Sequence, residues 1–299
     1  MKKLMMTFYR ELWEHRAVVI GVPVIVATLA LIAAVGIEVA KDRVADGSLA
    51  EIIREVSEEE DDLDVIQRKL EEGSSELQME FDSGVDSDFE RIGIFIGFSW
   101  LAGFYYLLSC LFADRKDRSI LFWKSLPISE TFNVFTKLGF GSIGVTLFGI
   151  VIGWLLMAVL WLFGLGEIGN GSMSLSLIYQ VTVGAVLAVL VGVLWGAPVF
   201  AYLAFASAAA KRSPFLLAVV PIPVMSFLEW VFLRDVNIVG FFMSHTPFVV
   251  LEHMSSQNQT NSVVQAFLVD GIQGLLQGLV VAALLIFATI WYRNNKFEI

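Results

Sequence analysis

The sequence predicts an all-α membrane protein with six transmembrane helices, and three observations lead to that prediction. Hydrophobic residues make up 57% of the chain and charged residues 17%, against about 45–50% and about 25% in soluble domains. The apolar residues gather into six runs long enough to cross a hydrocarbon core of about 30 Å as helices. Lys and Arg are unevenly divided between alternate connections of these runs, as positive-inside topology requires.

Residues 1–16, with the sequence MKKLMMTFYRELWEHR, predict an amphipathic helix ahead of the first span. Leu4, Phe8 and Leu12 recur every fourth residue, beside aromatic neighbours, and Glu11 lies on the opposite, polar side. A basic amphipathic helix with aromatics on its apolar face lies in the membrane interface. We expect an elbow helix anchored through Phe8, Leu12 and Trp13, and the alternative is a frayed tail.

A six-span transmembrane domain is expected over 17–299. Its spans are predicted at 17–37, 92–112, 138–165, 178–208, 215–232 and 271–292. The first run exceeds the core of about 7–15 residues of a cleavable signal peptide, so we interpret it as an uncleaved span. Three glycine pairs spaced by four residues should let neighbouring helices approach closely: Gly149 with Gly153, Gly192 with Gly196, and Gly274 with Gly278. Pro198, Pro221 and Pro223 should kink the fourth and fifth spans.

The basic residues predict that both termini lie in the cytoplasm. With this orientation, 13 of the 20 Lys and Arg residues fall in cytoplasmic segments and 7 fall outside. Most of those seven lie in the first outer segment, which is long and acidic. Positive charge near the ends of spans is the feature that sets topology.

Two outer segments follow from this topology. Residues 38–91 contain 19 acidic and 6 basic residues, and the spacing of Ile52, Val56, Leu63 and Ile66 predicts an acidic helical insertion. Its acidic run could attract cations, although a solvated acidic face is the favoured interpretation. Residues 234–270 form the second outer segment, whose apolar pieces are too short to span and suit short helices at the outer interface.

Sequence motifs for catalysis or cofactor binding are missing. The chain has no G-x-x-x-x-G-K-[ST], no H-E-x-x-H and no G-x-S-x-G. Its single cysteine, Cys110, lies in an apolar run, and the three scattered histidines do not form a metal-ligand pattern. Outside the acidic insertion the charge is close to neutral, which is unlike a nucleic-acid-binding protein. We therefore expect no catalytic residue, no bound cofactor or metal, and no nucleic-acid partner.

Few polar residues lie inside the predicted spans. Lys137, near the inner end of the third span, is expected to snorkel to the interface. Glu229, near the outer end of the fifth span, could line a pathway or pair with Arg234 at the interface. Gln273 and Gln277 lie one turn apart on the last span, where they could line a polar path or form an interhelical hydrogen bond. The spans thus offer no evident internal energy source for transport.

The cytoplasmic connection 113–131 predicts a docking element for a soluble partner. A charged start leads into a bulky apolar centre, Pro127 ends the predicted helix, and Ser129 or Thr131 can cap the next one. Arg and aromatic residues are favoured at interface hot spots. The candidate docking residues are Arg115, Lys116, Arg118, Phe122, Trp123 and Leu126. The alternative is that Phe122 and Trp123 only anchor the helix in the lipid headgroups.

This pattern resembles the permease subunits of the ATP-binding-cassette type-2 exporter family. The similarity lies in the six spans, the opening RELWEHR at 10–16, the DRKDRSILFWKSLPIS segment at 114–129, and Ser207 to Arg212 at the end of the fourth span. The resemblance implies an exporter subunit in the bacterial cytoplasmic (inner) membrane. Two permease copies, as a homodimer, would work with two copies of a separate ATPase that binds ATP and Mg²⁺. Segment 113–131 would then be the ATPase-coupling loop.

The insertion 38–91 is longer and more acidic than the connection expected in the drug and polysaccharide branches of that family. A second interpretation therefore stays open, in which the chain is a non-transporting scaffold or sensor whose acidic segment binds a cationic ligand or a partner protein. Deletion of residues 45–85 distinguishes the two, because a scaffold would lose its activity and a permease would keep its ATPase complex.

Overall fold

The computed structural model describes residues 2–36, 39, 88–116, 129–163, 175–234, 237–255 and 271–295, and these residues are helical apart from short turns. Five helices are long and apolar enough to cross a membrane: Arg16–Gly36, Ile92–Lys116, Glu130–Leu160, Pro214–Phe232 and Ile272–Asn295. A bent pair, Thr182–Trp195 and Ala197–Ala209, adds a sixth if it is counted as one span. The predicted all-helical, multi-pass membrane class is confirmed.

The chain begins with α1 (Lys2–Glu14), and α2 (Arg16–Val19) opens the first span. The second span lies in α5 (Asp88–Lys116), which continues four residues beyond its predicted end at residue 112. Asp114, Arg115 and Lys116 therefore belong to α5. The predicted connection at 113–131 therefore begins inside α5, whose basic last turn suits the C-terminal dipole of the helix.

The third span starts earlier than predicted, at Glu130 instead of residue 138. It consists of α7 (Glu130–Gly139), a π-helical turn η1 (Phe140–Gly144) and α8 (Val145–Leu162). Ser129 accepts a hydrogen bond from the Phe132 amide at 3.2 Å, which confirms the predicted cap of this helix. At η1 the backbone of Gly141 approaches α5 so closely that a Cβ on Gly103 would lie 2.2 Å from the Gly141 carbonyl oxygen.

The fourth span is broken rather than merely kinked. Helices α10 (Leu175–Trp195) and α11 (Ala197–Ala209) meet at an angle of 60°. Pro198 at the second position of α11 has no N–H to donate to α10, so the helix cannot continue through it. Gly196 at the break lies against Pro247, whose Cδ would be 3.1 Å from an added Cβ.

The remaining described helices lie within segment 234–270 or flank it in the sequence. The fifth span divides into α12 (Pro214–Val219) and α13 (Pro221–Leu233), with the break just before Pro221. Segment 234–270 contains two short helices, as expected, α14 (Asn237–Ser244) and α15 (Pro247–Ser255), and its position on the outer side stays a prediction. The last span is α17 (Gly271–Asn295). The predicted acidic insertion falls outside the described residues except at Val39 and 88–91.

One glycine of each predicted pair is a point of close contact. An added Cβ would lie 1.8 Å from Ser99 Oγ at Gly149, 2.4 Å from the Trp100 ring at Gly192, and 2.7 Å from the His245 ring at Gly278. These distances leave no room for a methyl group, so only glycine permits the observed helix approach.

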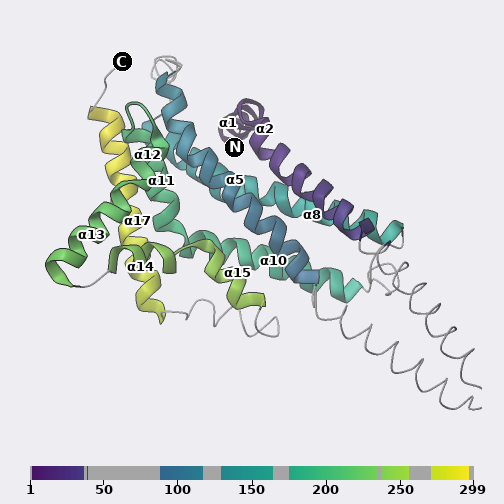
Figure 1. The fold of residues 1–299 in the computed structure, drawn as a ribbon. Coiled ribbons are helices and arrows are strands. Elements are labelled where there is room, and N and C mark those ends of the chain that lie inside the picture. Colours follow the sequence, from purple (N-terminus) through teal and green to yellow (C-terminus); the bar gives the residue numbers. More distant parts are fainter. Residues whose placement is uncertain are drawn as a thin grey trace, which may run out of the picture.

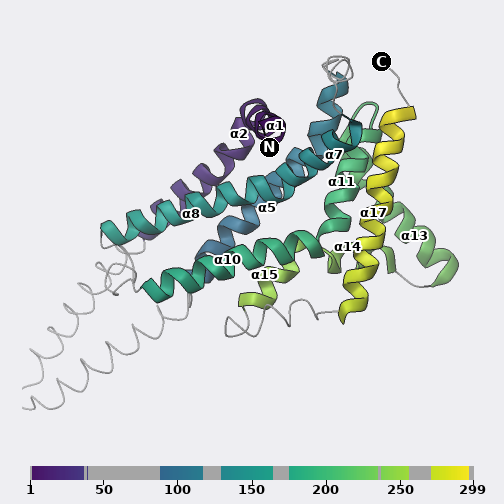
Figure 2. The same ribbon diagram turned by 180° about the vertical axis from the view of Figure 1, so that it is seen from behind.

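Helix α5 lies at the centre of the bundle and holds most of its buried core. Trp100, Tyr106 and Leu107 of α5 are fully buried together with Phe140 and Trp195. The first span packs through its small residues against a second cluster that includes Phe95 and Leu156. Figures 1 and 2 show α1, the C-terminal end of α5 and the C-terminal end of α17 at one end of the bundle. Helices α14 and α15 lie toward the other end.

Helix α13 stands at the edge of the bundle. It packs chiefly on its sequence neighbours α12 and α14, and both views show it beyond α17 (Figures 1 and 2). Phe227, Trp230 and Phe232 are all exposed, as is most of the span Pro214–Phe232. This helix therefore leaves a large apolar surface that the other described residues do not cover.

Candidate functional site: a buried ion-pair network

Lys137 of α7 is the centre of a buried network of charges at the end of the bundle that carries α1. Its side chain is only 1% exposed. The amine Nζ lies 3.2 Å from Glu11 Oε1 and 3.2 Å from Asp114 Oδ1, and it donates to the Cys110 carbonyl at 3.3 Å. The expectation that Lys137 snorkels to the interface is wrong, because two carboxylates from other helices hold the amine inside the bundle.

Glu11 brings the N-terminal helix into this network. Its side chain is 0% exposed, although the helical pattern placed it on the solvated face of α1. Tyr106 of α5 donates to Glu11 Oε2 at 2.6 Å, and Arg10 forms an ion pair with Oε1. Both carboxylate oxygens of Glu11 are therefore engaged by groups from α1, α5 and α7.

Arg293 connects the last span to the same network. Its Nε donates to Glu130 Oε2 at 2.8 Å, and its Nη1 lies 3.6 Å from Asp114 Oδ2. Asp114 thus faces Lys137 with one oxygen and Arg293 with the other. The network joins four elements that are far apart in sequence, namely α1, α5, α7 and α17.

Three cations and three carboxylates balance one another in the network: Arg10, Lys137 and Arg293 against Glu11, Asp114 and Glu130. Removing charges from water is costly, and mutual attraction repays the cost only where the geometry is good. Removing one member would leave its partner buried and uncompensated. The network therefore fixes the relative positions of the four elements more than it adds net stability.

Neighbouring charges and burial shift the pKa values of the ionisable groups at the end of α1 in opposite directions. Burial by itself would raise the pKa of Glu11, but Lys137, the Tyr106 hydroxyl and Arg10 together lower it below its usual value. Burial raises the pKa of Glu14 and lowers that of His15. At neutral pH, Glu11 is therefore held as a carboxylate, and the neutral imidazole of His15 packs edge-on against the Tyr106 ring with 4.8 Å between centroids.

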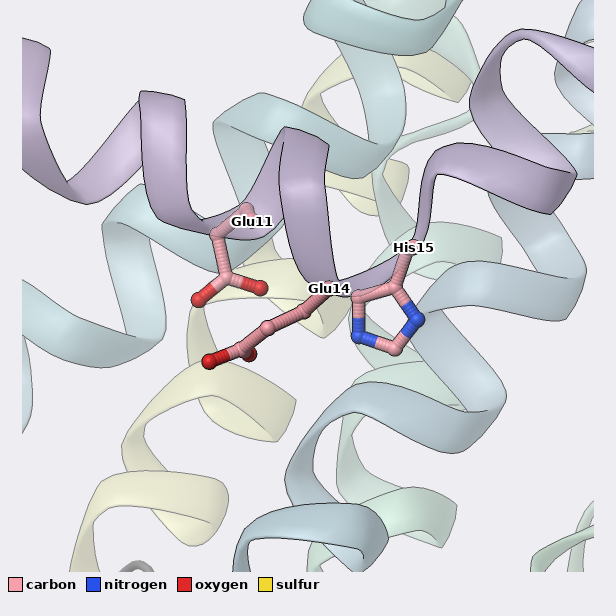
Figure 3. Close-up of side chains that lie close together, drawn as sticks. All are labelled: Glu11, Glu14 and His15. Atoms are coloured by element: carbon pink, nitrogen blue, oxygen red, sulfur yellow. The ribbon is translucent and has the colours of Figure 1, made fainter.

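Glu11, Glu14 and His15 form a possible metal-ligand group. Their ligand atoms lie within 4.8 Å of one another, and Figure 3 shows the three side chains close together at the end of α1. Glu11 already pairs with Lys137 and Arg10, and Glu14 Oε1 lies 3.5 Å from Arg10 Nε. A metal ion would have to displace these cations, so the trio fits the ion-pair network better than a metal site.

The predicted docking residues are only partly described. Arg115 lies in the last turn of α5 and donates to the Ser207 carbonyl at 3.2 Å and to the Ala210 carbonyl. Its guanidinium thus satisfies backbone acceptors at the end of α11, while Lys116 is exposed. Arg118, Phe122, Trp123 and Leu126 lie outside the described residues.

The predicted elbow anchors divide between two surfaces of α1. Phe8 and Leu12 pack on the main core, where Phe8 meets Phe140 edge-on at 5.4 Å between ring centroids. Trp13 is 67% exposed, like its neighbours Met6 and Tyr9. Helix α1 therefore has an inner apolar surface against η1 and an exposed outer aromatic surface, where Arg16 lies over the Trp13 ring.

The candidate pathway residues do not meet in the structure. Gln273 and Gln277 are both exposed on α17. Glu229 Oε2 accepts hydrogen bonds from the amides of Asn237 and Ile238, at 3.0 Å each, and so caps the N-terminus of α14. Arg234 does not pair with it there but lies over the Trp230 ring. A pathway role for the three residues stays a prediction.

Sequence reasoning missed the network because its members are separated by up to about 280 positions. Glu130 and Lys137 are seven residues apart on one helix and so share a face, which was the one available signal. The partners of that face come from α1, α5 and α17, and only the tertiary structure brings them together.

Comparison with known proteins gives no identification: no family model, no curated protein and no solved structure matches this chain.

Proposed function

We propose that this chain is the permease subunit of an ATP-driven transporter of the ATP-binding-cassette type, an exporter that works with a separate ATPase. In this proposal it has six spans, counting α10 and α11 as one, with both termini in the cytoplasm and α1 as the elbow helix. The expected setting is the bacterial inner membrane. Two copies of the ATPase would supply ATP hydrolysis, so the chain itself would not be an enzyme.

The ion-pair network is the observation that carries the proposal. A permease without its own energy source must receive force from a soluble partner at a cytoplasmic surface. The connection between α5 and α7 is the predicted surface, and Asp114 and Lys137 join the two helices that lead into and out of it. Glu11 and Arg293 extend this link to the elbow and to the last span.

Such a linkage suits a rigid-body mechanism. A push on the connection would move α5 and α7 together, because the buried ion pair between them resists separation. The elbow and α17 would move with them, while the breaks at Gly196 and Val220 leave α10 and α13 as separate segments. Rocking of one group of helices against another is a common way to alternate access.

The uncovered surface of α13 supports the proposal of a second permease copy. A span that packs mainly on its sequence neighbours contributes little to the folding of its own chain. Aromatic residues such as Phe227 and Trp230 suit the centre of a protein interface. Contact with the same helix of a second copy would give a two-fold symmetric dimer.

Purification from the native host tests the proposal. The tagged chain should co-purify in mild detergent with a stoichiometric soluble subunit that carries vanadate-sensitive ATP hydrolysis. Recovery of the chain without any ATPase would contradict the permease proposal, and recovery with an outer-face partner only would favour the scaffold or sensor.

A double substitution then tests the coupling surface. Phe122→Ala with Trp123→Ala should uncouple ATP hydrolysis from transport or release the ATPase. The matched control is Leu162→Ala with Phe163→Ala, which removes two apolar side chains that are exposed at the far end of α8. Equal behaviour of the two double variants would contradict a docking role for the connection.

A further inference from the structure

His245 forms a second buried polar centre, in the turn between α14 and α15. It is 3% exposed. Its ring lies between α10 and α17 and stacks on Trp195 with 5.2 Å between centroids and 7° between planes. The same turn is held by Trp195 Nε1, which donates to the Ser244 carbonyl at 2.7 Å. His245 therefore lies where the outer helices meet the break in the fourth span and the start of the last span.

Both ring nitrogens of His245 face backbone carbonyl oxygens. Nδ1 lies 2.8 Å from the Phe241 oxygen, and Nε2 lies 3.1 Å from the Gly274 oxygen of α17. A carbonyl only accepts hydrogen bonds, and a neutral imidazole has only one N–H. The imidazolium form alone can donate to both oxygens at once.

The neutral ring has a weaker alternative. Ser244 Oγ lies 3.2 Å from Nδ1 and 3.1 Å from the Phe241 oxygen. In the neutral state the serine hydroxyl can donate to Nδ1, and Nε2–H can still donate to Gly274. The hydrogen bond from the imidazole to α17 then loses its charge assistance, which roughly halves the strength of such bonds.

Among the described residues, aromatic rings and backbone carbonyls surround the imidazole, and no carboxylate contacts it. Besides Trp195, the Phe241 ring lies 4.2 Å from the His245 ring between centroids. Aromatic faces within about 6 Å attract a cation through the ring quadrupole. These ring faces offset part of the cost of burying a charged imidazole.

Few other titratable groups share this region of the bundle. The sequences of α10, α11 and α14 contain no Asp, Glu, Lys, Arg or His, and α17 has only Arg293, near its far end. The groups on the adjoining elements are Tyr179, Tyr202, Glu229, Arg234, Glu252 and His253. Of these, Tyr202 donates to the Ala218 carbonyl and Glu229 caps α14.

We propose that His245 is a proton-binding site that fastens the α14–α15 hairpin to the last span when it is protonated. Proton loss weakens the hydrogen bond to Gly274 and lets α15 separate more readily from the core, where Val250 is now fully buried. This inference does not depend on the proposed transport function, because it concerns only the hold of the hairpin on its own chain.

Histidine-selective NMR of the intact protein in detergent gives the first test. The chain contains three histidines, and a His245→Gln variant identifies the signal of His245. The ring should change between one and two protonated nitrogens within the range of pH over which the folded protein is stable. A ring that stays in one protonation state throughout would overturn the proposal.

Thiol labelling gives the second test and reports on the hairpin itself. In a Cys110→Ser background, Val250→Cys places a thiol under the hairpin, and Met243→Cys places a control thiol at a residue that is 65% exposed. Labelling of V250C is compared at each pH between proteins with His245 and with H245Q, which cancels the ordinary pH dependence of thiol reactivity.

The expected result is a several-fold slower labelling of V250C, relative to the H245Q background, as the pH falls through the titration of His245. M243C should show no such difference. A ratio independent of pH, or slower labelling at high pH, would overturn the proposal. If H245Q does not fold, the NMR titration and the V250C labelling curve of the His245 protein must still share one midpoint, and separate midpoints would count against the site.

Discussion

The amine of Lys137 lies 3.2 Å from Glu11 Oε1, so a helix at the start of the chain is fastened to the third span by a buried ion pair. Asp114 also binds the Lys137 amine, and Tyr106 and Arg10 bind the Glu11 carboxylate. Removing one charged side chain of this network leaves another buried without a counter-charge. The effects of substitutions within the network on stability should therefore be non-additive.

Replacement of Lys137 by Met should destabilise the protein by about 3–5 kcal/mol, because Glu11 and Asp114 would remain buried without their shared cation. Thermal unfolding in detergent measures the effect. The double variant Glu11→Gln with Lys137→Met should recover part of the loss. Arg212→Gln removes an exposed cation and should change the midpoint little. Additive effects of the two network substitutions would show that the pair is not coupled.

Replacement of Tyr106 by Phe should cost about 1.5–3 kcal/mol, because the hydroxyl donates to a charged acceptor, Glu11 Oε2. The ring and its contacts with Phe140 and His15 stay in place. The matched control is Tyr105→Phe on the exposed side of the same helix. Equal unfolding midpoints for the two variants would contradict the importance of this hydrogen bond.

Replacement of Gly103 by Ala should disrupt the contact of α5 with η1, because the new Cβ would lie 2.2 Å from the Gly141 carbonyl oxygen. Backbone atoms cannot move aside as a flexible side chain can, so we expect a loss of folded protein measured by size-exclusion chromatography. Gly139→Ala is the control, since nothing lies within 4 Å of its added Cβ. Alanine there should raise stability slightly by its higher helix propensity. Normal yield of the Gly103 variant would show that the helices do not approach so closely.

Acidification should destabilise the contact of α1 through His15. Burial lowers the pKa of His15 below its usual 6.5, so the unfolded chain binds this proton more readily, and stability falls as the pH falls through that value. The raised pKa of Glu14 acts in the opposite direction at more acidic pH. The unfolding midpoint of the native protein should therefore fall relative to that of His15→Gln between about pH 7.5 and about pH 5.5. Parallel curves would show that the imidazole is not buried.

Removal of the carboxylate cap of α14 should loosen the second outer segment. Glu229→Ala leaves the amides of Asn237 and Ile238 without their acceptor, at a cost of about 0.5–2 kcal/mol. Hydrogen exchange of these two amides should become faster, while that of α5 stays unchanged. Unaltered exchange at both amides would contradict the cap.

Sequence patterns predicted the spans well where composition alone decides them. The first and fifth candidate spans begin within one residue of the predicted positions, because hydrophobic length is a local property. The start of the third span was placed eight residues too late, since Asn133 and Lys137 interrupt its apolar run. Hydropathy does not detect a helical segment whose polar groups are buried among other helices.

The candidate site could be predicted only in part, for a related reason. The helical pattern of residues 1–16 correctly indicated an amphipathic helix, but it placed Glu11 on the solvated side. Burial of a carboxylate depends on the cations that surround it, here Lys137 and Arg10, and these are brought near by tertiary packing. Periodicity reports which side of a helix is polar, not whether that side faces water or a charged partner.

The π-helical turn at Phe140–Gly144 has a consequence for the register of the third span. Each residue of an α-helix advances the direction of its side chains by about 100°, and a π turn accommodates one additional residue. It therefore sets the phase between α7, which carries Glu130 and Lys137, and α8, whose Gly149 and Gly153 pack on α5. Deleting one residue from this turn would keep the span apolar and helical. It would also rotate Lys137 by about a quarter turn away from Glu11. The five residues of the turn therefore determine whether the ion pair of α7 and the glycine contacts of α8 can form together.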